Sequence, residues 1–102
     1  MNWQFHPEAL VEYLEAIAWY ESRRAGLGAA LSRETEALIQ SACDAPERFP
    51  TVDPTTIRRA HLKHFPYHVL FRIADDQLEV LAVAHNRRRP LYWQNRIQDR
   101  AG

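Results

Sequence analysis

The clearest structural signal in the chain is residues 67–84, which read YHVLFRIADDQLEVLAVA. Over residues 67–73 apolar and polar side chains alternate, so the odd-numbered residues share one face of a predicted β-strand. Residues 77–84 are nearly all apolar, as expected for a central strand that is buried on both faces. A compact turn at residues 74–76 joins the two strands. The stretch therefore predicts an antiparallel hairpin.

The N-terminal half of the chain has a helical period instead. Residues 3–5 predict a short strand, and Pro7 opens a helix at the position where its missing N–H is not needed. Apolar side chains then recur at helical spacing, at Leu10, Leu14, Ile17 and Tyr20. Gly26 ends this helix. A second helix is predicted from about 27 to about 44, and Pro46 lies in the break that follows. Because the link between the helices is short, they should form an antiparallel hairpin.

Two further elements complete the predicted fold. A strand at about 56–63 precedes the hairpin of strands, and a short final helix is expected over about 91–99. The order β-α-α-β-β-β is typical of an α+β fold in which a helical hairpin packs on one face of an antiparallel sheet. The opposite face is expected to be partly open. With 102 residues there is room for one hydrophobic core, so residues 1–102 should form a single domain.

Composition excludes several classes of protein. Apolar residues make up 46% of the chain and charged residues 25%, which is ordinary for a soluble globular domain. No apolar run approaches the roughly 20 residues that cross a bilayer, and the N-terminus lacks the pattern of a cleaved secretory signal. The single cysteine, Cys43, excludes an internal disulfide. We therefore expect a small cytoplasmic domain without a membrane segment.

Three histidines raise the question of a metal site. His61, His64 and His68 are spaced by three and four residues, which on a helix would bring ligands together. However, Phe65-Pro66 interrupts the segment, and strand alternation is expected to send His61 and His68 in unrelated directions. No cysteine pair or carboxylate completes a ligand set. We therefore expect no metal and no cofactor.

Charge is unevenly distributed, although the formal net charge is zero. Residues 1–50 carry 4 basic and 8 acidic side chains, whereas residues 51–102 carry 9 basic and 5 acidic ones. Residues 54–74 and 80–98 contain no acidic side chain. These two segments are expected to form one continuous positive patch, which would favour phosphate backbones or acidic protein partners. Its binding residues would be Arg58, Arg59, Lys63, Arg88, Arg89 and Arg96.

The same region could also carry acid–base chemistry. Cleavage of RNA through the ribose 2′-hydroxyl needs a base, an acid and cations for the phosphate. His61 or His85 could act as the base, and His85 or Tyr92 as the acid. Arg72 and Arg87 could bind the phosphate. The alternative is that these histidines are ordinary surface residues.

Six short stretches, taken in order along the chain, match a known family. They are FHPEA at 5–9, WYE at 19–21, GLG at 26–28, PERFP at 46–50, Arg58-Arg59 leading to Phe65-Pro66-Tyr67, and HNRRRP at 85–90 followed by Tyr92-Trp93. With this set the chain resembles the RelE/ParE superfamily of small bacterial toxins from type II toxin–antitoxin modules, sometimes labelled plasmid stabilisation proteins. The predicted element order is similar to the fold of that family.

The resemblance implies a toxin that arrests growth and a cognate antitoxin that binds and silences it. RelE-like members cleave messenger RNA on the ribosome, whereas ParE-like members poison DNA gyrase. Four residues lie roughly where RelE-like sites lie: Arg72, His85, Arg87 and Tyr92. The strand that carries His61 and Lys63 lacks the closely spaced lysine pair of the best-known nucleases.

The helical hairpin and the Phe-Pro-Tyr entry at residues 65–67 look more like ParE-type sequences. We therefore interpret the chain as a ParE-like growth inhibitor that acts on gyrase. Two alternatives stay open: a RelE-like, ribosome-dependent mRNA endoribonuclease, and a basic binding module that is not a toxin. Whether the chain is an enzyme follows from this choice, because only the RelE-like interpretation makes it one.

Overall fold

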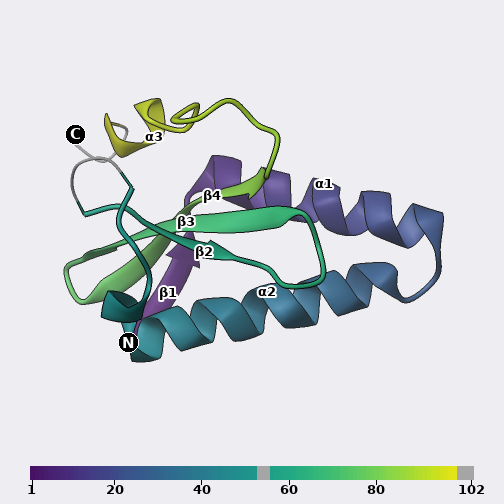
Figure 1. The fold of residues 1–102 in the computed structure, drawn as a ribbon, viewed down its shortest axis with the longest axis horizontal. Helices are drawn as coiled ribbons and strands as arrows, with labels where there is room; N and C mark the ends of the chain where they lie inside the picture. The colour runs from purple at the N-terminus through teal and green to yellow at the C-terminus, as the bar shows by residue number, and fades with distance from the viewer. Residues whose placement is uncertain (53–55, 99–102) are drawn as a thin grey trace.

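The computed structural model describes residues 1–52 and 56–98 of the chain (Figure 1). Its elements are β1 (Asn2–Phe5), α1 (Pro7–Arg23), α2 (Leu27–Asp44), the 3-10 turn η1 (Pro46–Arg48), β2 (Arg58–His61), β3 (Tyr67–Ala74), β4 (Gln77–His85) and α3 (Asn95–Gln98). This order confirms the predicted α+β fold. Among the described residues, no helix combines the length and the apolar character that a bilayer crossing requires.

The strands lie in the order β1-β4-β3-β2, which places the predicted hairpin at the centre of the sheet. Asp75 and Asp76 at its turn have φ angles of 54° and 60°, as tight two-residue hairpin turns require. β1 pairs with β4 in parallel, with Phe5 opposite Val80. The prediction of a wholly antiparallel sheet is therefore wrong at this edge. The direction of β1 is set by the path of two helices and not by a turn, so alternation along the strands could not reveal it.

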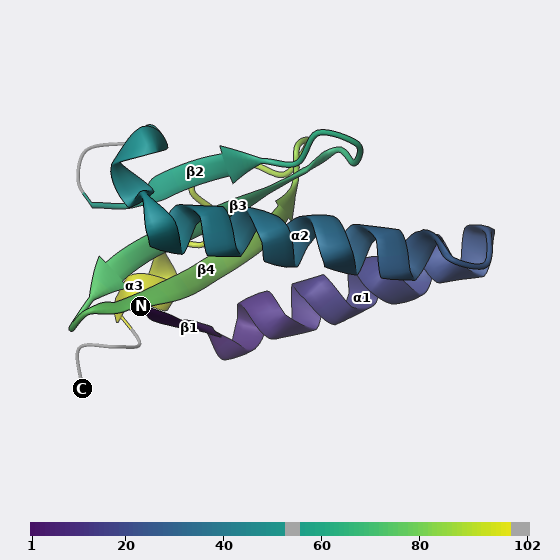
Figure 2. The same cartoon turned by 90° about the horizontal axis from the view of Figure 1, so that it is seen from below.

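The helical hairpin packs on one face of the sheet, as predicted (Figure 2). α1 turns Ala9, Tyr13 and Ala16 toward the core, while Leu10 and Leu14 on its other side are exposed. Helical spacing alone identified the larger residues as the apolar face. The small side chains pack inward because alanine lets the helix lie close to its neighbours. α1 therefore carries an exposed apolar strip in addition to its buried face.

The opposite face of the sheet is less open than the sequence indicated. The C-terminal segment crosses it, and Trp93 packs with Ile57, Leu70 and Leu81 in a second apolar cluster. Within the predicted final helix, residues 91–94 form turns and only α3 is helical; Asp99 lies outside the described residues. The C-terminal segment therefore leaves the end of the sheet near His61 and His68 as the accessible part of this face.

Gly28 fixes how closely the two helices approach. It is buried in the first turn of α2, and a Cβ at this position would lie 2.9 Å from the carbonyl oxygen of Ile17 and 3.0 Å from Glu21 Oε1. We expect Gly28→Ala to destabilise the protein by about 1–3 kcal/mol through overpacking. This loss outweighs the better helix propensity of alanine, which contributes about 1 kcal/mol. Urea unfolding measures the difference, and a more stable variant would contradict this packing.

Candidate functional site

Two histidines face each other at one end of the sheet. In the antiparallel pairing of β2 with β3, His61 lies directly opposite His68, and their ring centroids are 5.2 Å apart. The expectation that these side chains point in unrelated directions is therefore wrong. Residues that are directly opposite in an antiparallel pair project to the same face. Arg59 is two residues from His61 along β2, so it shares that face.

Asn86, which follows β4, holds His68 in one tautomer. Its Nδ1 lies 2.8 Å from Oδ1 of Asn86. An amide oxygen only accepts, so Nδ1 carries the proton and donates it, and in the neutral ring Nε2 is an acceptor. Burial lowers the pKa of His68, and the nearby His61, Arg59 and His85 lower it further, against the opposing effect of the Asn86 hydrogen bond. At neutral pH His68 therefore presents an unprotonated Nε2 near the Arg59 guanidinium.

The lowered pKa of His68 makes stability depend on pH. Below its ordinary value of 6.5, the unfolded chain takes up a proton that the folded protein resists, so stability is lost as the pH falls through this range. We expect the wild-type protein to lose more unfolding free energy between pH 7.5 and pH 5.5 than His68→Gln, which has no proton to gain. Urea unfolding of both proteins at each pH measures this. Equal losses would mean that the imidazole is not perturbed.

Arg72, which was predicted to bind phosphate, is engaged by a carboxylate. Its Nε lies 3.0 Å from Oε1 of Glu79, and only 13% of its side chain is exposed. Arg72 is four residues from His68 along β3, a separation of about 14 Å in a strand. It therefore contributes little free positive charge to the histidine pair.

His85 lies on the other side of the sheet from His68. It is opposite Tyr67 in the β3–β4 pairing, with ring centroids 5.1 Å apart, and Tyr67 packs against Tyr20 of α1. Nδ1 of His85 accepts the backbone N–H of Arg87 at 3.1 Å. His85 is thus near enough to His68 to lower its pKa, but it faces the helices.

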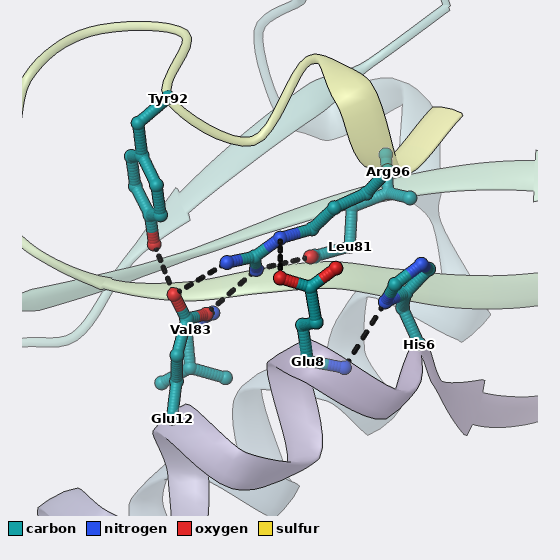
Figure 3. A network of polar contacts seen from close by, with 7 residues as sticks. All are labelled: His6, Glu8, Glu12, Leu81, Val83, Tyr92 and Arg96. Atoms are coloured by element: carbon teal, nitrogen blue, oxygen red, sulfur yellow. Dashed lines mark hydrogen bonds and ion pairs between the residues drawn. The ribbon is translucent and has the colours of Figure 1, made fainter. Parts of the chain in front are cut away.

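Tyr92 and Arg96, predicted as a catalytic acid and as part of the basic surface, instead belong to a network around Glu12 of α1 (Figure 3). The Tyr92 hydroxyl donates to Glu12 Oε2 at 2.7 Å, and Arg96 donates to both Glu12 oxygens at 2.9 Å. Glu12 Oε1 also accepts the backbone N–H of Val83 at 3.0 Å, and Arg96 Nη1 donates to the carbonyl of Leu81. Arg96 is only 6% exposed, so it is not part of an exposed basic surface.

The network also fixes the ionisation of its members. Burial raises the pKa of Glu12, but hydrogen bonds from Arg96, Tyr92 and Val83 outweigh it and the net effect is a lowered pKa. Burial and the Glu12 carboxylate raise the pKa of Tyr92. Glu12 is therefore charged and Tyr92 is a neutral donor at physiological pH. The network closes the edge of β4 beyond the end of β1 and attaches the C-terminal segment to α1.

The residues expected to form a continuous positive patch are therefore not all exposed. Arg59, His61 and Lys63 are exposed on β2 and just after it, and residues 87–89 form a second exposed group after β4. The side chain of Arg58 donates to the carbonyl of Phe49 at 2.6 Å, at the edge of the sheet. Sequence reasoning considered His68 only as a metal ligand and set it apart from His61, because only the β2–β3 register reveals that the two side chains face each other. Among the described residues, no group of three potential ligands could hold a metal ion.

A groove of about 360 Å³ lies between α1 and the free end of β4. Glu15, Trp19 and Tyr20 line it from α1, and His85 and Arg88 from the other side. Trp19 is 51% exposed. The groove is thus aromatic and carries charges of both signs, in contrast to the face of the sheet that carries His61 and His68.

Comparison with known proteins agrees with this fold. The profile of the family described as "ParE toxin of type II toxin-antitoxin system, parDE" matches residues 4–90. A solved structure titled "Chromosomal ParDE TA system from P. aeruginosa" superposes with a TM-score of 0.71 at 10% identity, covering 83% of this chain and 95% of that one. No curated protein matches the chain. Because the family profile spans most of its length, this chain belongs to the ParE toxin family of type II toxin–antitoxin systems.

Proposed function

We propose that this protein arrests bacterial growth by acting on DNA gyrase in the cytoplasm, and that a cognate antitoxin neutralises it. Membership of the ParE toxin family supports this proposal. One observation favours this function over that of a ribonuclease: Arg72 donates a hydrogen bond to Glu79, and the Tyr92 hydroxyl donates one to Glu12. Cleavage of a phosphodiester needs free cations and a proton donor beside the phosphate, and these two side chains are already committed to carboxylates.

The groove between α1 and β4 supports an antitoxin partner. It has aromatic walls, and the exposed Leu10, Val11 and Leu14 lie along the same helix. Monomeric proteins seldom leave contiguous apolar surface uncovered unless a partner binds it. An antitoxin segment that runs along α1 would bury Trp19 and the apolar strip together. The solved ParDE structure that matches this fold comes from a toxin–antitoxin system.

A growth assay separates the proposal from its two alternatives. The wild-type protein and the variants Arg87→Gln and Tyr92→Phe would each be induced in a bacterial host, with and without the neighbouring antitoxin gene, and growth would be compared. We expect all three proteins to stop growth, the antitoxin to restore it, and plasmid supercoiling to fall during the arrest. Loss of toxicity in both folded variants would indicate a nuclease, and harmless expression of the wild type would indicate a binding module.

A further inference from the structure

We propose that the cross-strand pair of His61 and His68 binds a divalent transition-metal ion such as Zn²⁺, with one imidazole nitrogen from each ring and water in the remaining positions. The two side chains lie on the face of the sheet opposite the helices, away from the α1–β4 groove. Binding of the ion involves neither gyrase nor an antitoxin, so the proposal goes beyond the toxin function.

The register of β2 with β3 brings the two histidines close enough to chelate an ion. His61 lies opposite His68, and the ladder hydrogen bond beside them runs from the N–H of Leu62 to the carbonyl of Tyr67 at 3.0 Å. The histidines are therefore a non-hydrogen-bonded pair, the kind in which opposite side chains lie closest. A metal ion with nitrogen ligands at about 2.1 Å lies about 3.2 Å from each ring centre, so two imidazoles in tetrahedral positions have centres about 5 Å apart. The observed centroid separation of 5.2 Å matches this geometry.

Asn86 prepares His68 as a ligand. The Nδ1–H of His68 donates to Asn86 Oδ1 at 2.8 Å, so the lone pair of the neutral ring is on Nε2. Histidines that bind metals almost always donate their other ring N–H to an oxygen in this way, because that bond fixes the tautomer and the orientation of the ring. Among the residues that the structure describes, none bonds to Nε2 of His68. Water satisfies this nitrogen in the metal-free protein, and the ion would displace it.

His61 supplies the second nitrogen. Its side chain is exposed and forms no hydrogen bond or ion pair within residues 1–52 and 56–98, so its ring is free to turn a nitrogen toward His68. Imidazole nitrogens suit Zn²⁺, Cu²⁺ and Ni²⁺, whereas Mg²⁺ and Ca²⁺ prefer oxygen ligands. Two protein ligands are one fewer than a catalytic zinc site has, so the ion would keep open positions that face solvent.

Two features of the surroundings bear on this site. The β2–β3 register removes one reason for expecting no metal, which was that His61 and His68 point apart. Arg59, in contrast, opposes a cation, because it lies on the same face and about 7 Å from His61 along β2. Its positive charge lowers the affinity and also gives the proposal a test of sign. Loss of Arg59 would weaken an anion site, but it should strengthen a cation site.

Isothermal titration calorimetry of the untagged chain with zinc chloride tests the proposal, and we expect one ion to bind per chain. His61→Gln and His68→Gln should each weaken binding at least about ten-fold, because a single imidazole no longer chelates the ion, and Asn86→Ala should weaken it about ten-fold through loss of orientation. Arg59→Gln should tighten binding about two- to five-fold. His64→Gln removes another exposed imidazole three residues from His61 and should leave binding unchanged.

Several results would overturn the proposal. They are no binding at millimolar zinc, a loss in His64→Gln equal to that in His61→Gln, and weaker binding in Arg59→Gln. NMR of the wild-type histidines keeps the test independent of variant folding. Zinc should shift the Nε2 resonance of His68 and leave its Nδ1–H bonded to Asn86, and an unshifted Nε2 at saturating zinc would also contradict the site. Neither measurement involves gyrase or an antitoxin, so failure here leaves the proposed function standing.

Discussion

Glu12→Ala should lower the free energy of unfolding by about 3–5 kcal/mol, because it leaves the buried charge of Arg96 with only Glu8, a half-exposed carboxylate 3.8 Å from its Nε, as a counter-ion. Arg96 is 6% exposed and donates to both carboxylate oxygens, and the hydroxyl of Tyr92 and the N–H of Val83 lose their acceptor in the same change. For a domain of this size the melting temperature should fall by at least about 12 °C. Thermal unfolding followed by circular dichroism measures this.

Glu15→Ala is the matched control for Glu12→Ala. Glu15 lies on the same helix, is exposed, and forms no ion pair or hydrogen bond with the described residues. Its replacement should change the unfolding free energy by no more than about 0.5 kcal/mol. The double variant Glu12→Ala, Arg96→Met should recover part of the loss, because it removes the buried charge that has lost its main partner and keeps an apolar side chain in its place. If Glu12→Ala and Glu15→Ala both had a similarly small effect, the network would not hold the C-terminal segment.

The second large effect is expected at Trp93. This side chain is 4% exposed and packs on Ile57, Leu70 and Leu81, so it covers the face of the sheet that the helices do not. Trp93→Ala should cost about 3–5 kcal/mol through the lost burial and the cavity that remains. Urea unfolding measures the cost, and amide hydrogen exchange should become faster in β4 around Leu81.

Trp19→Ala provides the comparison for Trp93. Trp19 is the same residue type but is half exposed on α1, with Tyr20 and Arg23 as its contacts. We expect a loss below about 1 kcal/mol, because little surface leaves the core. If Trp93→Ala were no more harmful than Trp19→Ala, the C-terminal segment would not be docked on the sheet.

Local patterns were sufficient for much of this fold. The helical period with the proline break at Pro46 fixed the limits of α2, and the Asp75-Asp76 turn fixed the central hairpin. Features that depend on distant parts of the chain could not be derived this way. The parallel direction of β1 arises from pairing between residues 75 positions apart, and Trp93 docks on residues of three other segments, 12 to 36 positions earlier in the chain. No local period encodes either feature.

In the candidate site, too, local sequence identified some residues, whereas others depend on distant parts of the chain. Sequence reasoning identified Arg59 and His61 because a run of basic residues is visible in the chain. It separated His68 from His61 because the loop between β2 and β3 does not fix the register that pairs them. Arg72 and Tyr92 were assigned as free functional groups because their partners, Glu79 and Glu12, lie on another strand and on a helix. Charge in a sequence shows which side chains are available, and only the fold shows which are already paired.

The most direct test of the central claim is the supercoiling of relaxed plasmid by purified gyrase in the presence of this protein. The proposed function predicts that supercoiling is inhibited, that equimolar antitoxin restores it, and that messenger RNA on ribosomes in a parallel translation reaction stays intact. Undiminished supercoiling together with cleavage of the ribosome-bound message would contradict it.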